Sequence, residues 1–188
     1  MKKEIPIEQA YRLINHGPVV LVTSAYKDKT DIITVAWQTP VSKSPMLMAI
    51  SLGVNSLSLD LIEKSEEFAV NIPPVHLLDK VKFCGTHSGT GTDKFSATGL
   101  TPVKAQRVRP PLIEECIGHL ECQLYNVIKA GDHKLLIGAV VTARVDEDKY
   151  DVFLRVDKEG ARTIHHLGGD HFVASGALEL LPESQTIT

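Results

Sequence analysis

Residues 83–95 read Phe83-Cys84-Gly85-Thr86-His87-Ser88-Gly89-Thr90-Gly91-Thr92-Asp93-Lys94-Phe95, and this stretch is the most informative in the chain. A short apolar segment, 77–83, runs into a loop rich in Gly, Ser and Thr that ends in a cation beside an aromatic ring. Such a loop can bring backbone N–H groups, hydroxyls and one ammonium close to an anion or an electron-rich ring. An ordinary surface loop can have the same composition, so other segments must decide between the two interpretations.

Apolar patterns on both sides of this loop predict strands that alternate with short helices. Helices are expected where apolar residues share one face and a capping residue or proline precedes them, at 5–15, 55–65 and 77–83. Strands are expected where apolar residues run or alternate between turn signals, at 19–26, 32–38, 46–52, 68–72, 117–129, 134–146 and 177–181. Residues 85–111 are expected to form a long connection held against the body of the protein, and residues 151–156 either a strand or a helical turn.

This order of elements predicts the fold class. Many antiparallel strands with helices inserted between them are typical of an α+β protein built on a β-barrel. The 188 residues contain no internal repeat and no linker, so we expect one domain, 1–188, with a core over roughly 10–181.

Composition excludes several classes of protein. The net charge of -3 and the lack of a basic run argue against a nucleic-acid binder. The longest apolar runs, such as 18–22 and 135–141, are too short to cross a membrane. The first residues lack the apolar segment of a signal peptide, so a cytoplasmic location is expected.

The cysteines and histidines indicate neither a disulfide framework nor a metal site. Cys84, Cys116 and Cys122 are odd in number and form no CxxC motif. Cys116 and Cys122 are expected in the core, whereas Cys84 is either buried or reactive. The segment 165–172 is rich in His and Gly, but its spacing matches no zinc or iron pattern, and it fits a backbone lying close to a flat ligand at least as well.

Three further segments are candidate ligand sites. Trp37 either packs in the core or lies beside a planar ligand whose edge bonds the amides of residues 36–40. The loop 51–58 joins a strand to a helix, where free N–H groups either bind a phosphate or are simply capped. Gly131-Asp132-His133 is a hairpin turn. The chain has no GxGxxG after its first strand, no Walker A sequence and no GxSxG.

Taken together, these blocks resemble the flavin reductase-like family of FMN-binding split barrels, and within it the flavoredoxin branch. The resemblance covers roughly residues 10–180, and the order and spacing of its short blocks are jointly specific. The matching blocks are Ile33-Thr34-Val35-Ala36-Trp37, Phe68-Ala69-Val70-Asn71-Ile72, Cys84-Gly85 with Ser88-Gly89 and Asp93-Lys94-Phe95, Gly131-Asp132-His133 with Ile137-Gly138, and Leu167-Gly168-Gly169 with Phe172.

The resemblance implies an antiparallel split β-barrel and a homodimer with one FMN per subunit near the dimer interface. It implies no metal and identifies no catalytic residue. Lys94, as a loop residue, is expected to contact the flavin and to contribute little to packing. The cofactor-binding residues that the resemblance implies are Thr34, Ala36, Trp37, Gln38, Thr39 and Ser42 near the ring, Ser51, Asn55, Ser56 and Ser58 toward the phosphate, and Lys94, His133 and Phe172 around the pocket.

Two positions depart from the family pattern, which often has Asn at position 31 and Thr at position 58. Ser58 keeps the hydroxyl, but an ionised Asp31 cannot donate as an amide would, so no role at the flavin is assigned to it. The activity implied is that of an FMN-dependent oxidoreductase with NAD(P)H as donor. The alternatives are an FMN electron carrier that docks a protein donor, and a non-catalytic flavin- or haem-binding protein of the same fold. The sequence does not choose between FMN and FAD, or between a bound cofactor and a released product.

Overall fold

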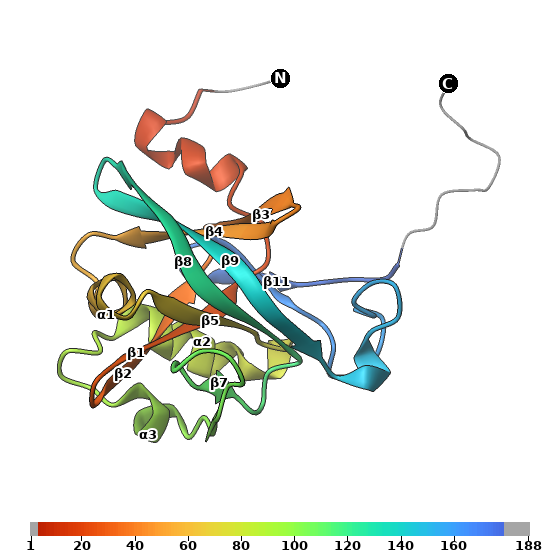
Figure 1. The fold of residues 1–188 in the computed structure, drawn as a ribbon. Coiled ribbons are helices and arrows are strands. Elements are labelled where there is room, and N and C mark those ends of the chain that lie inside the picture. The colour runs from red at the N-terminus through yellow and green to blue at the C-terminus, as the bar shows by residue number, and fades with distance from the viewer. Residues whose placement is uncertain (1–3, 179–188) are drawn as a thin grey trace.

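A seven-stranded antiparallel sheet organises the protein in this computed structural model, which describes residues 4–178 (Figure 1). Its strands follow the order β2-β1-β5-β8-β9-β4-β3. The longest pair, β8 and β9, forms a hairpin around the turn at residues 131–132. The strands of this sheet are β1 (Val20–Tyr26), β2 (Lys29–Val35), β3 (Gln38–Lys43), β4 (Met46–Gly53), β5 (Glu67–Ile72), β8 (Gly118–Ala130) and β9 (His133–Val145).

Short helices and two small hairpins complete the described chain. The helices are the 3-10 helix η1 (Ile7–Leu13), α1 (Leu57–Ser65), the 3-10 turn η2 (Val75–Leu77), α2 (Leu78–Thr86), α3 (Lys94–Thr98) and the 3-10 turn η3 (Glu147–Lys149). The small pairs are β6 (Pro102–Val103) with β7 (Leu112–Ile113), and β10 (Ile164–Gly168) with β11 (His171–Ala174).

The sheet is curled around its main apolar core. β2 and β4 come into contact although they are not neighbours in the hydrogen-bonded order. β2 and β3 each have one strand partner among the described residues, so the strand ladder there is open rather than a closed barrel. Phe68 of β5 lies at the centre of the core, and a methyl group at Gly138 of β9 would overlap its ring. The absence of a side chain at Gly138 is therefore what lets the ring pack there.

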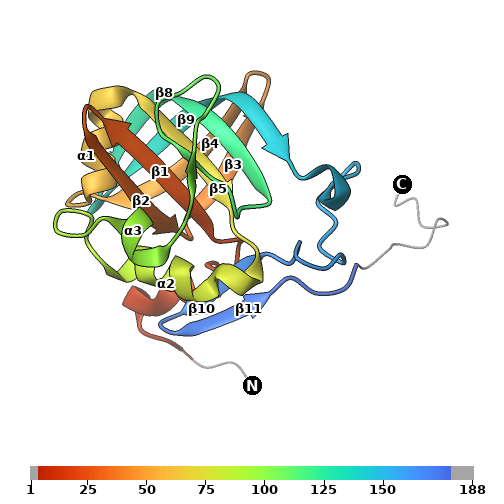
Figure 2. The ribbon, with the colours of Figure 1, turned by 90° about the horizontal axis from the view of Figure 1, so that it is seen from below.

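A second layer lies against β1 and β2 (Figure 2). Helix α2 packs on β2, and the β10–β11 hairpin lies beside α2. Backbone hydrogen bonds join the hairpin to the start of β1, because Val19 N donates to Ile164 O at 2.7 Å. The hairpin, α2 and η1 thus meet at one side of the sheet.

The long connection predicted at 85–111 is held against the sheet by a buried carboxylate. Glu121 of β8 is 1% exposed and accepts hydrogen bonds from the backbone N–H groups of Gln106 and Arg107 and from the Arg144 guanidinium. Burial by itself would raise the pKa of Glu121, but these hydrogen bonds lower it below its ordinary value. The carboxylate therefore stays ionised and keeps the loop in place.

Most of the predicted elements are confirmed, with differences in bounds and at the periphery. The strand predicted at 32–38 is β2 at Lys29–Val35, and the connection predicted at 85–111 contains the short helix α3 and the strand β6. The exposed edge strand β3 was missed, because Pro40 within it argues against a strand. The predicted helix 5–15 is only η1, and it buries none of its residues. Residues 151–156 form neither a strand nor a helix beyond the isolated bridge between Tyr150 and Leu154. Of the predicted strand 177–181, the first two residues are irregular and the rest lie outside the described residues.

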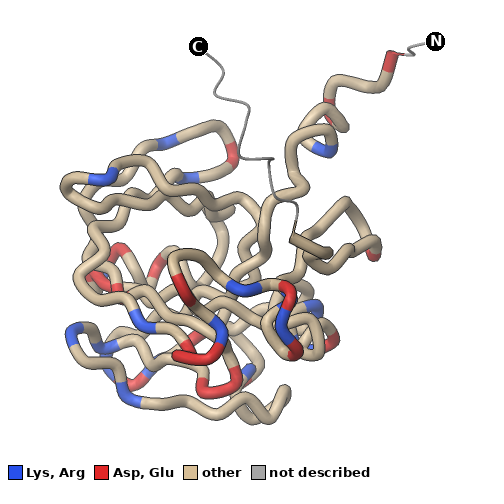
Figure 3. Tube along the Cα trace, turned by 90° about the vertical axis from the view of Figure 1, so that its right-hand side faces the viewer, with Lys and Arg blue, Asp and Glu red and all other residues tan. Residues whose placement is uncertain are grey.

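Within residues 4–178, no helix has both the length and the apolar content that a membrane crossing requires. Acidic and basic residues are interspersed along the trace (Figure 3).

Candidate functional site

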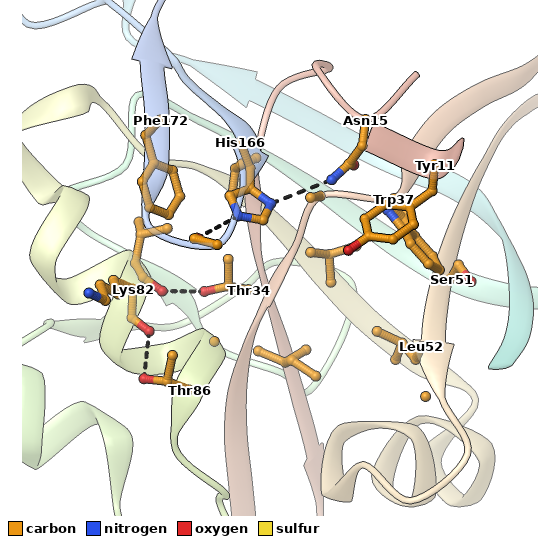
Figure 4. Close-up of a pocket in the computed structure, with 18 of the residues that line it drawn as sticks. Tyr11, Asn15, Thr34, Trp37, Ser51, Leu52, Lys82, Thr86, His166 and Phe172 are labelled. Atoms are coloured by element: carbon orange, nitrogen blue, oxygen red, sulfur yellow. Dashed lines mark hydrogen bonds between the residues drawn. The ribbon is translucent and has the colours of Figure 1, made fainter. Parts of the chain in front are cut away.

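A cavity of about 560 Å³ lies between the sheet, α2, the β10–β11 hairpin and η1 (Figure 4). This volume falls within the range of roughly 300–1,000 Å³ that is usual for small-molecule sites. We call it the main cavity. It is lined by Tyr11, Asn15, Val19, Ile33, Thr34, Val35, Ala36, Trp37, Ser51, Leu52, Gly53, Val81, Lys82, Gly85, Thr86, His133, His166, Gly169, Asp170 and Phe172.

Aromatic rings stand on two sides of the main cavity (Figure 4). The Trp37 ring lies between β2 and β3, 40% exposed, with its centroid 5.7 Å from that of Tyr11 and 4.9 Å from that of His133. On the other side, the rings of His166 and Phe172 are 4.9 Å apart. Rings arranged in this way favour a flat, partly apolar ligand between them.

A hydrogen-bonded pair joins η1 to the β10–β11 hairpin at the cavity wall. His166 Nε2 lies 2.9 Å from Gly169 O, and Asn15 Nδ2 lies 3.4 Å from His166 Nδ1. Because a carbonyl can only accept, Nε2 carries the proton and Nδ1 accepts from Asn15. The other amide atom, Asn15 Oδ1, is buried and has no hydrogen-bond partner among the described residues. An N–H or O–H group of a ligand could fill that place.

The Thr34 hydroxyl and Gly85 set the position of helix α2 on β2. Thr34 Oγ1 donates to Val81 O at 2.5 Å, so this hydroxyl is used to position the wall of the cavity. A methyl group at Gly85 would lie 3.1 Å from Thr34 Cβ, which requires a very small residue there. Lys82 of α2 forms an exposed ion pair with Asp170 at 3.0 Å, which links α2 to the β10–β11 hairpin.

A smaller cavity of about 260 Å³ adjoins the main cavity. We call it the polar cavity, and the two share Ile33, Gly85 and Thr86. Helix α1 begins beside it, where Ser56 Oγ accepts from Leu59 N at 3.3 Å. The first N–H groups of a helix lack intrahelical acceptors and attract anions. The polar cavity is lined by Asp31, Ile33, Asn55, Ser56, Leu57, Cys84, Gly85, Thr86, His87, Ser88, Gly89 and Lys94.

A buried cluster of charged and polar groups forms the inner wall of the polar cavity. Lys94 Nζ lies 3.0 Å from Asp31 Oδ1, and both side chains are 3% exposed. The same ammonium donates to Ile32 O at 2.6 Å and to Cys84 O at 3.3 Å. Ser58 Oγ donates to Asp31 Oδ2 at 2.6 Å. The expectation that Lys94 contributes little to packing is therefore wrong, because its charge is buried and paired inside the fold.

Cys84 also lines the polar cavity but is not a reactive thiolate. Burial raises the pKa of its thiol to about 11, and the nearby Lys94 ammonium offsets this only in part. Cys116 and Cys122 are buried as predicted, and burial raises the pKa of both thiols as well. All three cysteines are free.

A third cavity, of about 420 Å³, also borders Trp37 and is lined by Gln38 and Thr39. We call it the side cavity. Tyr11, Asn15 and Trp37 line both it and the main cavity, so the two adjoin. Its lining residues are Tyr11, Ile14, Asn15, Gly17, Ala36, Trp37, Gln38, Thr39, Ala49, Ser51 and Leu135.

The structure brings most of the sequence-predicted site residues to these three adjoining cavities. Ser42 is an exception, since it pairs with Leu47 beyond a bulge in β3 and lines none of them. The Ser58 hydroxyl is buried and contacts Asp31 instead. Thr34, Ala36, Trp37, Ser51, His133 and Phe172 line the main cavity, Gln38 and Thr39 the side cavity, and Asn55, Ser56 and Lys94 the polar cavity.

Sequence reasoning missed several residues of the main cavity. Tyr11 and Asn15 lie in or just after η1, which was predicted only as a helix with one apolar face and not as part of a site. His166 and Asp170 belong to the Gly-rich segment that was expected near a flat ligand, so a signal for them existed. Lys82 lies one residue before the stretch 83–95, and nothing in the sequence around it indicated a role in a ligand site. Within residues 4–178, no three His, Cys, Asp or Glu side chains come together to hold a metal ion.

Comparison with known proteins identifies the family. Residues 12–165 match the model of the flavin reductase like domain. The chain belongs to the flavin reductase-like family. The resemblance of the sequence to this family is thereby confirmed.

Individual proteins resemble the chain over half of its length or more. The uncharacterized protein YddH of Escherichia coli (strain K12) is 35% identical over 94% of this chain and 97% of its own. The NADH-dependent FAD reductase of Streptomyces globisporus is 29% identical over 56% of this chain and 57% of its own. The flavoredoxin of Desulfovibrio vulgaris (Miyazaki F) superposes with a TM-score of 0.85, with 25% identity over 98% of both chains.

Proposed function

We propose that the protein is an FMN-dependent oxidoreductase that holds the flavin ring in the main cavity and the flavin phosphate in the polar cavity. The observation that carries this proposal is that the two cavities adjoin, since both are lined by Ile33, Gly85 and Thr86. A larger, mostly apolar cavity adjoins a small polar one at a helix N-terminus. FMN has the same sequence of parts, a flat ring joined by a polar chain to a phosphate.

The main cavity supports the ring end of FMN. The two groups of aromatic rings flank the space, and the backbone at Ala36 and Trp37 falls between β2 and β3, beside it. The unpartnered Asn15 Oδ1 is a buried acceptor at the wall of the cavity. A bound ring that offers an N–H group would give this atom a donor and would exclude water from both.

The polar cavity supports the phosphate end. Helix α1 starts there. Ser56 Oγ caps the N–H of Leu59, the other N–H groups of the first turn lack intrahelical acceptors, and Asn55 adds a polar side chain. Backbone amides at a helix start bind phosphate through both hydrogen bonds and the helix dipole. Ser88 and Gly89, from the Gly-rich loop within residues 83–95, line the same cavity.

Bound FMN would accept electrons from a donor and pass them to an acceptor. The residues of the chain bind and orient the cofactor and keep water from it. Thr34 and Gly85 fix α2 on β2, the Lys82–Asp170 pair links α2 to the β10–β11 hairpin, and His166 with Asn15 ties that hairpin to η1. The walls are therefore fixed relative to each other before the cofactor binds.

We propose NADH or NADPH as the electron donor. The side cavity supports this, because it adjoins the main cavity at Trp37 and gives room for a second molecule next to the flavin. The test is to add each nicotinamide to the FMN-loaded protein without oxygen and to follow flavin absorption. Rapid bleaching by one of them is expected. Bleaching by dithionite but by neither nicotinamide would favour an electron carrier with a protein donor.

We also propose that the protein is a homodimer, as the family resemblance implies. Apolar side chains are exposed on the β8–β9 hairpin, where Tyr125 is 64% and Ile128 44% exposed, and a partner could cover them. Light scattering of the FMN-loaded protein at micromolar concentration should give twice the mass of the chain. A single-chain mass under these conditions would contradict the dimer.

Three further expectations from the sequence remain proposals. They are that residues 1–188 form one domain, that the curled sheet is the split barrel of the family, and that the protein acts in the cytoplasm.

A further inference from the structure

The polar cavity contains a carboxylate that the proposed function does not explain. Asp31 lines it together with Lys94, and the two charges lie 3.0 Å apart with 3% of each side chain exposed. An acidic group beside a phosphate site is unfavourable by itself, because two negative charges repel strongly where water is excluded.

The charges of the two side chains cancel within the cavity. Asp31 contributes one negative charge and Lys94 one positive charge. Of the other titratable side chains in the lining, Cys84 is a neutral thiol and His87 is an exposed ring stacked on Phe83 at 3.9 Å. The buried wall therefore presents no net charge to an anion.

Most of the bonding capacity of Lys94 is used as well. Of the three N–H donors of its ammonium, two hydrogen bonds go to Ile32 O and Cys84 O. Asp31 Oδ1 lies 3.0 Å from Nζ as an ion pair, although this oxygen has no hydrogen-bond partner among the described residues. Asp31 is fixed in its turn, because Ser58 donates to it and a methyl group at Gly89 would overlap its carboxylate. A phosphate in the cavity would find a cation that already donates to two carbonyls and is paired with a carboxylate.

We propose that Asp31 is a specificity-determining residue that weakens the selection of phosphorylated flavins by neutralising Lys94. This inference rests on the proposed function, in which the flavin phosphate lies in the polar cavity. The preference for FMN over riboflavin then comes only from the N-terminus of α1 and from neutral polar side chains of the lining, such as Asn55 and Ser88. We expect this preference to be small. An asparagine at position 31 would restore an unpaired cation and convert the cavity into a strongly phosphate-selective site.

The test is the ratio of the riboflavin and FMN dissociation constants, measured by fluorescence titration in three variants and the parent. Asp31→Asn leaves a net positive charge and is expected to raise the ratio about tenfold or more, with the increase reduced by salt. The double variant Asp31→Asn/Lys94→Met removes both charges and should keep the parental ratio. Asp28→Asn removes an exposed carboxylate elsewhere and should also leave the ratio unchanged.

The outcomes separate this inference from the function on which it rests. Flavin binding with the same ratio in Asp31→Asn as in the parent overturns the role of Asp31 and leaves the flavin site standing. Failure of the parent to bind either flavin overturns both. If Asp31→Asn does not fold, Asp31→Asn/Lys94→Met still tests the proposal. A loss of the preference for FMN in this double variant would show that Lys94 acts on the phosphate despite Asp31, and would overturn the proposal.

Discussion

Replacing Gly53 with phenylalanine is expected to weaken FMN binding by at least about a hundredfold while the protein remains folded. Gly53 ends β4 and lines the main cavity, and no atom lies within 4 Å of a side chain added there. Along β4, Ile50 and Leu52 point into the core, so position 53 faces the opposite side with Ser51. A phenyl ring would thus fill the space assigned to the flavin ring without disturbing the core.

Gly176→Phe is the matched control, because Gly176 is exposed, has open space around it and lines none of the three cavities. Both variants should melt close to the parent, and only Gly53→Phe should lose FMN in a fluorescence titration. Parental FMN affinity in Gly53→Phe would mean that the flavin ring lies elsewhere.

Replacing Lys94 with methionine is expected to lower the free energy of unfolding by about 3–5 kcal/mol, because the change leaves the Asp31 carboxylate buried without its partner. This is a large share of the stability of a typical domain, which is about 5–15 kcal/mol. Urea unfolding at neutral pH measures the difference.

Asp31→Asn/Lys94→Met is the control, since it removes both charges of the pair. Replacing a buried ion pair as a whole is often close to neutral, so the double variant should recover most of the lost stability. A single Lys94→Met variant as stable as the parent would show that the pair does not stabilise the fold, and would restore the expectation that this lysine contributes little.

The predictable part of the fold is the part with strong periodicity. β8 and β9 alternate over long stretches around an obvious turn, and they lie within about a residue of their predicted bounds. The failures are local. β3 contains Pro40 and is mostly exposed, so neither composition nor alternation marks it as a strand. η1 has a helical apolar face, but that face borders the cavities rather than the core.

The candidate site was predictable where residues lie in recognisable blocks and unpredictable where partners come from far along the chain. Trp37, Asn55 and His133 line the cavities as expected. Lys94 looked like a free loop cation because nothing in its neighbourhood shows that Asp31, on β2, is its partner. The Asn15–His166 pair spans 151 positions, and only the folded chain brings it together.

The measurement that tests the central claim most directly is a titration of the purified protein with FMN, followed by flavin fluorescence and visible absorption. The two adjoining cavities predict saturation at about one FMN per chain with a dissociation constant in the micromolar range or below. Suppose instead that the melting curve shows a folded protein and that none of FMN, FAD and riboflavin binds at micromolar concentration. That result would contradict the proposal that the protein binds a flavin.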